Sequence, residues 1–198
     1  MPIIVDKDKK RRDIALSVRE LLLEKGIKNL SITDIVKKAG ISRGSIYDYF
    51  ETKEDIVFEI IMNDLRDFQK TLVKKFNKNT STKEKVLYFF DFVLSETEKS
   101  VQERNVYKEY LSVSFTSKNE KMAVFNKECS FLLKNILSSM IQEGINKNEL
   151  KDNSIKLVNG LLALEKGFLV LLWTEKKEIK KEFIEFLDTL FELMKKDK

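Results

Sequence analysis

Histidine is absent from this chain of 198 residues, and cysteine and proline each occur only once. Without histidine there is no His-based catalytic triad and no histidine-containing zinc site, and a lone cysteine cannot build a thiolate cage. Cys129 also has no partner for an intramolecular disulfide, which is consistent with a reducing compartment. The glycine-rich motifs of nucleotide-binding loops are missing as well. We therefore expect no metal, no cofactor and no enzyme activity.

Residues that break helices are equally scarce. The sequence has six glycines, and its single proline is Pro2. No segment alternates apolar and polar residues as a strand does, and no Asn-Gly or Asp-Gly pair marks a hairpin. Apolar residues make up 42% and charged residues 35% of the chain, which suits a helical protein with a real core. The sequence predicts an all-α fold of about nine helices.

Long apolar segments are missing too. The longest one, residues 160–173, is short and is interrupted by Glu165 and Lys166, so it cannot be a transmembrane helix. Residues 1–12 lack the apolar core of a secretion signal. We expect a cytoplasmic protein that has no membrane partner.

Positive charge gathers near the amino terminus. Residues 1–53 hold 12 Lys and Arg against 8 Asp and Glu, which is +4 of the net +5. A basic amino-terminal quarter favours contact with phosphates, although ordinary solubilising lysines would give the same count. The run from Lys9 to Arg12 is a candidate for contact with a DNA backbone, or alternatively a solvated helix end.

Residues 31–53 have the pattern of a helix-turn-helix. Ser31 or Thr33 can cap a first short helix, and Gly40 can supply the left-handed turn that follows it. Ser42 can cap a second helix, in which Ile46 and Phe50 share the buried face. Such a second helix is the one that enters the major groove of DNA.

The same residues resemble the DNA-binding domain of TetR-family transcriptional regulators, over about residues 14–61. The resemblance rests on a list of short motifs: Ile35, Ala39-Gly40-Ile41-Ser42, Gly44-Ser45-Ile46-Tyr47, Tyr49-Phe50 and Lys53-Glu54. It implies a DNA-binding domain of three helices, followed by a helical domain that binds an effector and forms a homodimer. We place the boundary between residues 1–53 and 54–198.

Eight residues are candidates for DNA contact. Arg43 can bind guanine through two hydrogen bonds, Ser45 can bond to several bases, Gly44 lets the backbone come close, and Tyr47 can touch a thymine methyl or a phosphate. The other four would position the duplex backbone: Thr33, Ser42, Tyr49 and Lys53. Tyr49 could equally be a half-buried structural ring.

Apolar periodicity predicts six helices after the helix-turn-helix, at residues 53–76, 82–101, 105–115, 117–144, 153–173 and 178–195. The first of these would link the two domains. In the last two, apolar residues at three- and four-residue spacing suit helix–helix packing, and the resemblance implies a four-helix dimer interface. The predicted interface residues are Leu161, Phe168, Leu172, Phe183, Phe186, Leu187, Leu190 and Met194. These helices could instead cover only their own core.

Aromatic residues of the carboxy-terminal part could line a ligand cavity, and the resemblance implies a small-molecule inducer. The candidates are Phe89, Phe92, Tyr107, Tyr110, Phe125 and Phe168. For each of them ordinary core packing is an alternative. Glu165 and Lys166 could meet a ligand or a partner chain, or extend to solvent.

The sequence therefore predicts a homodimeric repressor that binds a pseudo-palindromic operator and is released by a small, largely apolar effector. An all-helical module that binds lipid or protein, without sequence-specific DNA binding, is the main alternative. A carboxylate-only enzyme is a third, and no motif favours it.

Overall fold

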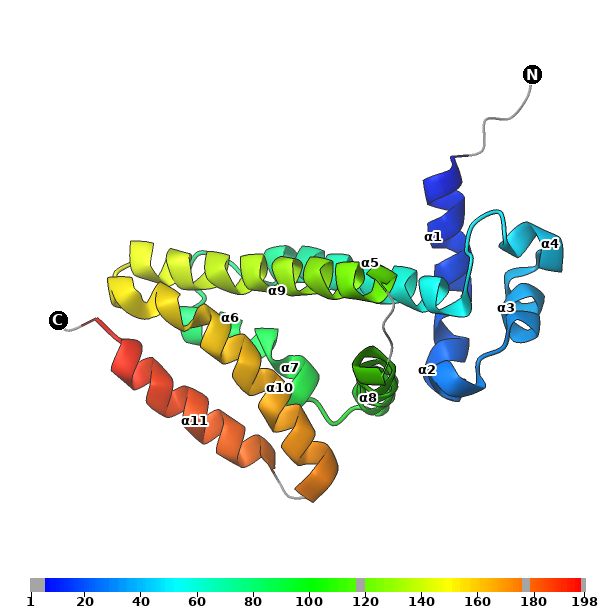
Figure 1. The fold of residues 1–198 in the computed structure, drawn as a ribbon. Coiled ribbons are helices and arrows are strands. Elements are labelled where there is room, and N and C mark those ends of the chain that lie inside the picture. Colours follow the sequence, from blue (N-terminus) through cyan, green and yellow to red (C-terminus); the bar gives the residue numbers. More distant parts are fainter. Residues whose placement is uncertain (1–5, 117–119, 176–178, 197–198) are drawn as a thin grey trace. The chain divides into compact units, whose positions relative to one another are not determined.

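A computed structural model describes residues 6–116, 120–175 and 179–196 (Figure 1). Its helices are α1 (Lys7–Ser17), α2 (Arg19–Asn29), α3 (Ile32–Ala39), α4 (Arg43–Ile46), α5 (Lys53–Lys75), α6 (Thr82–Phe89), α7 (Asp91–Leu94), α8 (Glu98–Thr116), α9 (Glu120–Asn146), α10 (Val158–Glu175) and α11 (Ile179–Met194). A 3-10 helix, Asp152–Leu157, precedes α10. These residues contain no strand, and the only pairing of that kind is the isolated bridge between Leu150 and Lys195. The all-α prediction is confirmed.

The chain forms two compact units. One consists of Met1–Phe68 and Thr97–Lys127, and the other of Gln69–Glu96 and Glu128–Lys198. The predicted domain boundary after Lys53 is a functional division and stays a prediction. The unit that contains the helix-turn-helix also holds α8 and the first parts of α5 and α9.

The first unit is built around side chains from the amino-terminal helices. Val18, Ile35 and Ile46 are completely buried, as is Ile56 at the start of α5. Arg19 of α2 ties this core to two other helices, because its guanidinium binds Asp64 of α5 at 2.8 Å and Glu103 of α8 at 2.8 Å. Burial alone would lower the pKa of Arg19, but the hydrogen bonds and charges of Asp64 and Glu103 outweigh it and raise that pKa.

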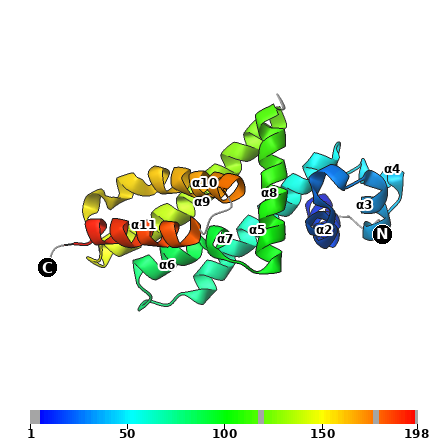
Figure 2. The same ribbon diagram turned by 90° about the horizontal axis from the view of Figure 1, so that it is seen from below.

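The second unit packs α10 and α11 against α6 and α7. Phe90 and Phe183 are fully buried and meet edge to face at 5.3 Å, and Phe168 packs on Phe183 at 4.6 Å. α10 and α11 run in opposite directions (Figures 1 and 2). In the first half of α6, buried Lys85 binds Glu143 of α9 at 2.6 Å.

Helix boundaries differ from the prediction where apolar periodicity runs through a break in the helix. Val18 separates α1 from α2, and Phe90 separates α6 from α7; both have backbone angles outside the helical region. Residues 95–97 then end the predicted 82–101 helix, and α8 begins at Glu98. A periodic pattern reports which side chains are buried, and these two are buried whether or not the helix continues. The described chain therefore has eleven α-helices instead of about nine.

Candidate nucleic-acid interface

The helix-turn-helix is held by reciprocal caps. Ser31 Oγ accepts a hydrogen bond from the Asp34 N–H at 3.1 Å, and Asp34 accepts one from the Ser31 N–H at 3.3 Å. Of the two predicted caps, Ser31 is therefore the one that caps α3. Gly40 ends the helix in the left-handed conformation, with φ of 65°, as the sequence predicts. A residue with a Cβ would be strained there although the space around it is open.

Asp34 also anchors α3 to α2. The Lys25 ammonium lies 2.8 Å from its carboxylate. Hydrogen bonds from Lys25 and then Ser31 lower the pKa of Asp34 to about 2. The carboxylate therefore stays ionised at neutral pH, and the cap and the ion pair remain formed together.

The second helix presents a polar surface over a buried base. Ser42 Oγ caps α4 by accepting from the Ser45 N–H at 3.0 Å, while Ile46 and Phe50 are buried beneath. Arg43, Gly44 and Tyr47 are exposed, with 51% of Tyr47 accessible. Side chains that could reach a base edge thus stand on a rigid support.

The remaining predicted contacts differ in how freely they could reach DNA. Thr33 and Ser42 are exposed, whereas Ser45 and Tyr49 are half-buried. Ser45 Oγ lies 2.8 Å from Ser42 Oγ, so the two hydroxyls already share a hydrogen bond. The exposed lysines at the end of α3, Lys37 and Lys38, were not among the predicted contacts, because nothing in the sequence distinguishes them from other surface lysines.

Lys53 binds backbone carbonyls at the end of α2. Its Nζ donates to the backbone carbonyls of Ile27 at 2.9 Å, Lys28 at 3.3 Å and Leu30 at 3.2 Å. These are carbonyls at the end of α2, where a cation is favourable. Phosphate contact by Lys53 stays a prediction, but all three of its ammonium protons already have acceptors.

We expect Lys53→Met to lower the free energy of unfolding by about 1–3 kcal/mol, because it leaves partly buried carbonyls without a charged donor. Urea unfolding of the two proteins measures this loss. Lys38→Met is the matched control and should change stability by less than about 0.5 kcal/mol, as an exposed substitution does. Unchanged stability in Lys53→Met, together with a salt slope of DNA binding reduced by about one, would assign Lys53 to a phosphate instead.

Glu109 of α8 holds the same turn from another side. Gly26 interrupts α2 with φ of 73°, and one further turn continues to Asn29. Glu109 Oε2 accepts a hydrogen bond from the Lys28 N–H at 2.9 Å. A Cβ on Gly26 would lie 2.5 Å from Glu109 Oε1, so the carboxylate occupies the place of a side chain. Lys53 and Glu109 together form what we call the α2 clamp.

The basic run from Lys9 to Arg12 lies on α1, and its side chains have two different roles. Arg11 donates to Glu59 at 2.9 Å and to the Tyr49 carbonyl at 3.1 Å, and its guanidinium lies 4.7 Å from the centre of the Phe50 ring. Lys9, Lys10 and Arg12 remain exposed. Arg11 therefore holds the residues that follow α4 in place, and the other three cations of the run stay at the surface.

The six aromatic residues predicted to line a ligand pocket are distributed over both units. Tyr107, Tyr110 and Phe125 belong to the first unit, and Phe89, Phe92 and Phe168 to the second. Tyr107 stacks on Tyr110 at 6.0 Å, and Phe125 meets Tyr110 edge to face at 5.8 Å. Their part in ligand binding stays a prediction, and ordinary aromatic packing accounts for these contacts.

The predicted dimer residues fall into two groups. Leu161, Phe183, Leu187 and Met194 are buried within the chain itself, and the other four are half-buried: Phe168, Leu172, Phe186 and Leu190. Exposed apolar side chains do occur on the same helices, namely Val170, Leu171, Ile184 and Leu193. The dimer interface stays a prediction.

Two ionisable groups on the long helices have shifted pKa values. Burial raises the pKa of Glu165 to about 7, against a smaller opposing effect of Lys166. Burial, with the charge of Glu128, raises the pKa of the Cys129 thiol to about 12, so that the thiol is protonated and unreactive at neutral pH.

In residues 6–116, 120–175 and 179–196, no group of His, Cys, Asp and Glu side chains could hold a metal ion. Within those ranges no helix has the length and hydropathy required to cross a membrane.

Comparison with known proteins relates the amino-terminal region to one family. Residues 18–60 match the family of bacterial regulatory proteins of the tetR type. The regulator PksA of Bacillus subtilis is 27% identical over 110 residues, which is 54% of this chain and 52% of PksA. The Staphylococcus aureus regulator SAB2452 is 35% identical over 63 residues, 32% of this chain and 34% of that protein. The matches thus span about half, or less, of the length of these relatives.

Solved structures extend the likeness of the fold to nearly the whole chain. A TetR transcription regulator from Haloarcula marismortui superimposes with a TM-score of 0.74 at 16% identity, over 96% of this chain and 100% of that one. Bacillus subtilis FadR, solved in complex with stearoyl-CoA, gives a TM-score of 0.62 at 19% identity over 91% and 95%. The helix-turn-helix and the family match agree over residues 18–60, and nearly the whole chain shares the fold of these solved regulators.

Proposed function

We propose that the protein is a transcriptional regulator that binds a specific DNA operator through residues 31–53. The observation that carries this proposal is the exposed face of Arg43, Gly44 and Tyr47 on a helix-turn-helix locked by the Ser31 and Ser42 caps. An arginine can bind guanine O6 and N7 together, and a tyrosine ring can pack on a thymine methyl. A regulator acts on the chromosome, so the proposal includes a cytoplasmic location.

Surface charge supports contact with the duplex backbone. Lys9, Lys10 and Arg12 on α1 are exposed, and so are Lys37 and Lys38 on α3. Each cation that neutralises a phosphate releases counterions, which gives affinity that is independent of sequence but depends on salt. The proposal therefore divides the work: these cations position the duplex, and Arg43 with Tyr47 reads its bases.

A homodimer is part of the proposal. Val170 and Leu171 of α10 and Ile184 and Leu193 of α11 are exposed, by 49%, 37%, 40% and 68%. Exposed apolar side chains on two adjacent helices favour burial against a second copy, and four helices from two chains form a common dimer interface. Two recognition helices could then enter successive major grooves roughly 34 Å apart.

Control by a small effector completes the proposal. The fold neighbour FadR was solved in complex with stearoyl-CoA, a ligand whose acyl chain is apolar, which supports a small-molecule effector here. An effector lowers operator affinity only if it binds the arrangement that does not bind DNA more tightly than the arrangement that does.

Titration of the protein against a pool of random duplexes, followed by fluorescence anisotropy and selection of the bound fraction, tests the function. We expect an enriched site with two-fold symmetry, and log affinity that falls against log salt with a slope of roughly −0.9 per phosphate contacted. Weak, unselective binding with a flat salt dependence would contradict the proposal. That outcome would instead favour a helical module that binds lipid or protein.

A further inference from the structure

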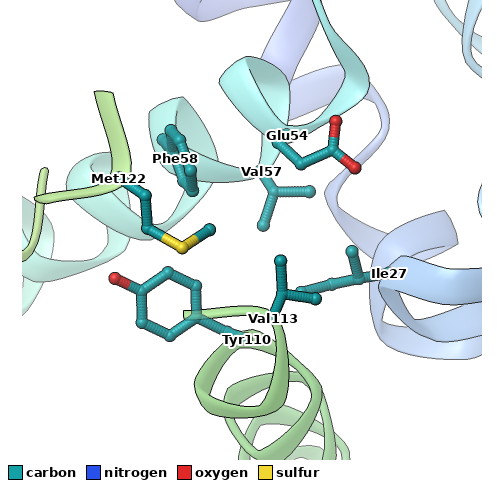
Figure 3. A pocket seen from close by; sticks show the side chains of 7 residues that line it. All are labelled: Ile27, Glu54, Val57, Phe58, Tyr110, Val113 and Met122. Carbon is teal, nitrogen blue, oxygen red and sulfur yellow. The ribbon is translucent and has the colours of Figure 1, made fainter. Parts of the chain in front are cut away.

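A small cavity lies in the core of the first unit, where α5 meets α2, α8 and α9 (Figure 3). Seven side chains surround it, and Ile27, Val57 and Met122 are among them. Its volume of about 10 Å³ has room for about one water molecule. A cavity of that size admits no effector, and Asp48 on the surface of the same unit is the stronger candidate for a ligand contact.

Asp48 lies on the side of the recognition helix that faces away from the core. The helical turn continues past α4, since the Asp48 N–H donates to the Ser45 carbonyl at 3.3 Å. The Phe50 N–H then donates to the Ile46 carbonyl at 3.0 Å, and both of these residues are buried. Two residues advance a helix by about 200°, so Asp48 stands almost opposite Ile46, next to the exposed Tyr47. Asp48 is itself exposed, and it faces the duplex when this helix enters the major groove.

The space in front of the Asp48 side chain is open. A side chain on a helix leans toward the amino terminus and covers the preceding turn, where Gly44 lies four residues earlier. Apart from its chain neighbours and the helix backbone, a Cβ on Gly44 would have only Ser42 Oγ within 4 Å, at 3.8 Å. Among the described residues, none forms an ion pair or a hydrogen bond with the Asp48 carboxylate. The carboxylate is therefore free to accept a hydrogen bond from a ligand at this face.

DNA offers few partners to a carboxylate. Phosphates repel it, and the donors on base edges in the major groove are the amino groups of cytosine, at N4, and of adenine, at N6. On adenine the amino group stands beside the N7 acceptor, which repels a carboxylate. The edge of cytosine presents its amino group without a neighbouring acceptor of its own, so cytosine is the base that suits a carboxylate best.

We propose, on the basis of the proposed function, that Asp48 is a specificity-determining residue that accepts a hydrogen bond from the N4 amino group of a cytosine in each half-site. Arg43 lies five residues earlier, about 7.5 Å along the helix, which corresponds to roughly two base-pair steps. The cytosine therefore lies within about three base pairs of the guanine that Arg43 binds. Where another base stands opposite Asp48, the carboxylate has no donor and lies near phosphates, so the contact also acts against wrong sequences.

Selection of operators by the unmodified protein and by Asp48→Ala tests this contact. We expect the unmodified protein to select a cytosine in each half-site at that distance from the guanine, and Asp48→Ala to select near-random bases there while keeping the guanine. Replacing the cytosine in one half-site should weaken binding of the unmodified protein by roughly 5-fold to 100-fold, as a mismatch does, and that of Asp48→Ala by less than about 2-fold. Asp13→Asn removes one negative charge from an exposed position of α1 and should leave the selected sequence unchanged.

A modified base locates the interaction at one atom. N4-methylcytosine keeps its Watson–Crick pair and puts a methyl group in place of the N4 proton that points into the major groove. At the selected position of one half-site it should weaken binding of the unmodified protein by roughly 10-fold or more, because a hydrogen bond to a charged group is lost. Asp48→Ala should bind the methylated and unmethylated duplexes with affinities within about 2-fold of each other.

The outcomes are distinguishable from failure of the proposed function. Identical selected sequences for the unmodified protein and Asp48→Ala would show that Asp48 recognises no base, even if Asp48→Ala bound every duplex more tightly through loss of repulsion. A changed position that was not cytosine, or an equal loss from N4-methylcytosine in both proteins, would also overturn the assignment. In all of these cases a symmetric site is still selected. If neither protein selects a sequence, the proposed function fails and the assignment of Asp48 fails with it.

Discussion

Arg43→Ala is expected to weaken binding to the selected operator by roughly 30-fold to 10,000-fold. One bidentate contact to guanine contributes about 1–3 kcal/mol of discrimination, and a symmetric dimer would lose it in both half-sites. Arg43 is exposed at the first position of α4, so its removal should not disturb the buried Ile46 beneath. Fluorescence anisotropy with the selected duplex, at a fixed salt concentration, measures the effect.

Two companion variants separate base reading from simple charge. Arg43→Lys keeps the charge but not the planar fork, so it should retain most of the salt slope while losing preference for guanine. Arg66→Ala removes another exposed arginine, from α5, and should leave affinity almost unchanged. If Arg43→Ala bound the operator as tightly as the unmodified protein, the assignment of the reading face to α4 would be wrong.

Arg19→Met should lower the free energy of unfolding by about 3 kcal/mol, since it leaves Asp64 and Glu103 without their shared cation. The Arg19 side chain is 14% exposed, and its three carboxylate contacts are 2.8, 2.8 and 3.1 Å long. Methionine fills much of the same volume, so the loss reports the charges and not an empty space. Urea unfolding of the two proteins gives the difference.

The partners of Arg19 provide the control. Glu20 is 77% exposed, and Glu20→Ala should change the unfolding free energy by less than about 0.5 kcal/mol. Asp64→Asn should cost less in the Arg19→Met background than alone, with a coupling energy of about 1 kcal/mol or more. Additive effects of Arg19→Met and Asp64→Asn would show that the guanidinium does not hold α2 to α5 as the geometry indicates.

Sequence reasoning succeeded where function and folding use the same local signals. The turn at Gly40, the cap at Ser42 and the buried pair Ile46 and Phe50 all involve residues within a few positions of one another. Capping and 3.6-residue periodicity describe such short-range relations directly. The all-α class followed from the same patterns and from the scarcity of proline.

Capping and periodicity do not predict contacts between residues that are far apart in the sequence. Glu109 meets the Lys28 amide across 81 positions of sequence, and Lys53 reaches carbonyls 23 to 26 positions earlier. The sequence around Lys53 suggests a phosphate ligand, because a lysine follows the recognition helix. The residues next to Lys53 do not indicate that carbonyls at the end of α2 will accept its hydrogen bonds. Burial of Phe183 and Leu187 inside the second unit was hidden for the same reason, since an apolar stripe does not say which partner covers it.

The hydrogen bond between the Ser42 and Ser45 hydroxyls sets a limit on how much information the operator can carry. Ser45 can bond to a base only by giving up or sharing that 2.8 Å contact, so a correct base exchanges one hydrogen bond for another and gains little over a wrong one. Arg43, which has no such alternative recorded in the described structure, gives up only water. In an alignment of selected sequences, the information content of the base pairs opposite Arg43 should approach about two bits per position. The information content of the base pairs opposite Ser45 should stay close to that of random sequence. The operator would then consist of a few strict positions separated by degenerate ones.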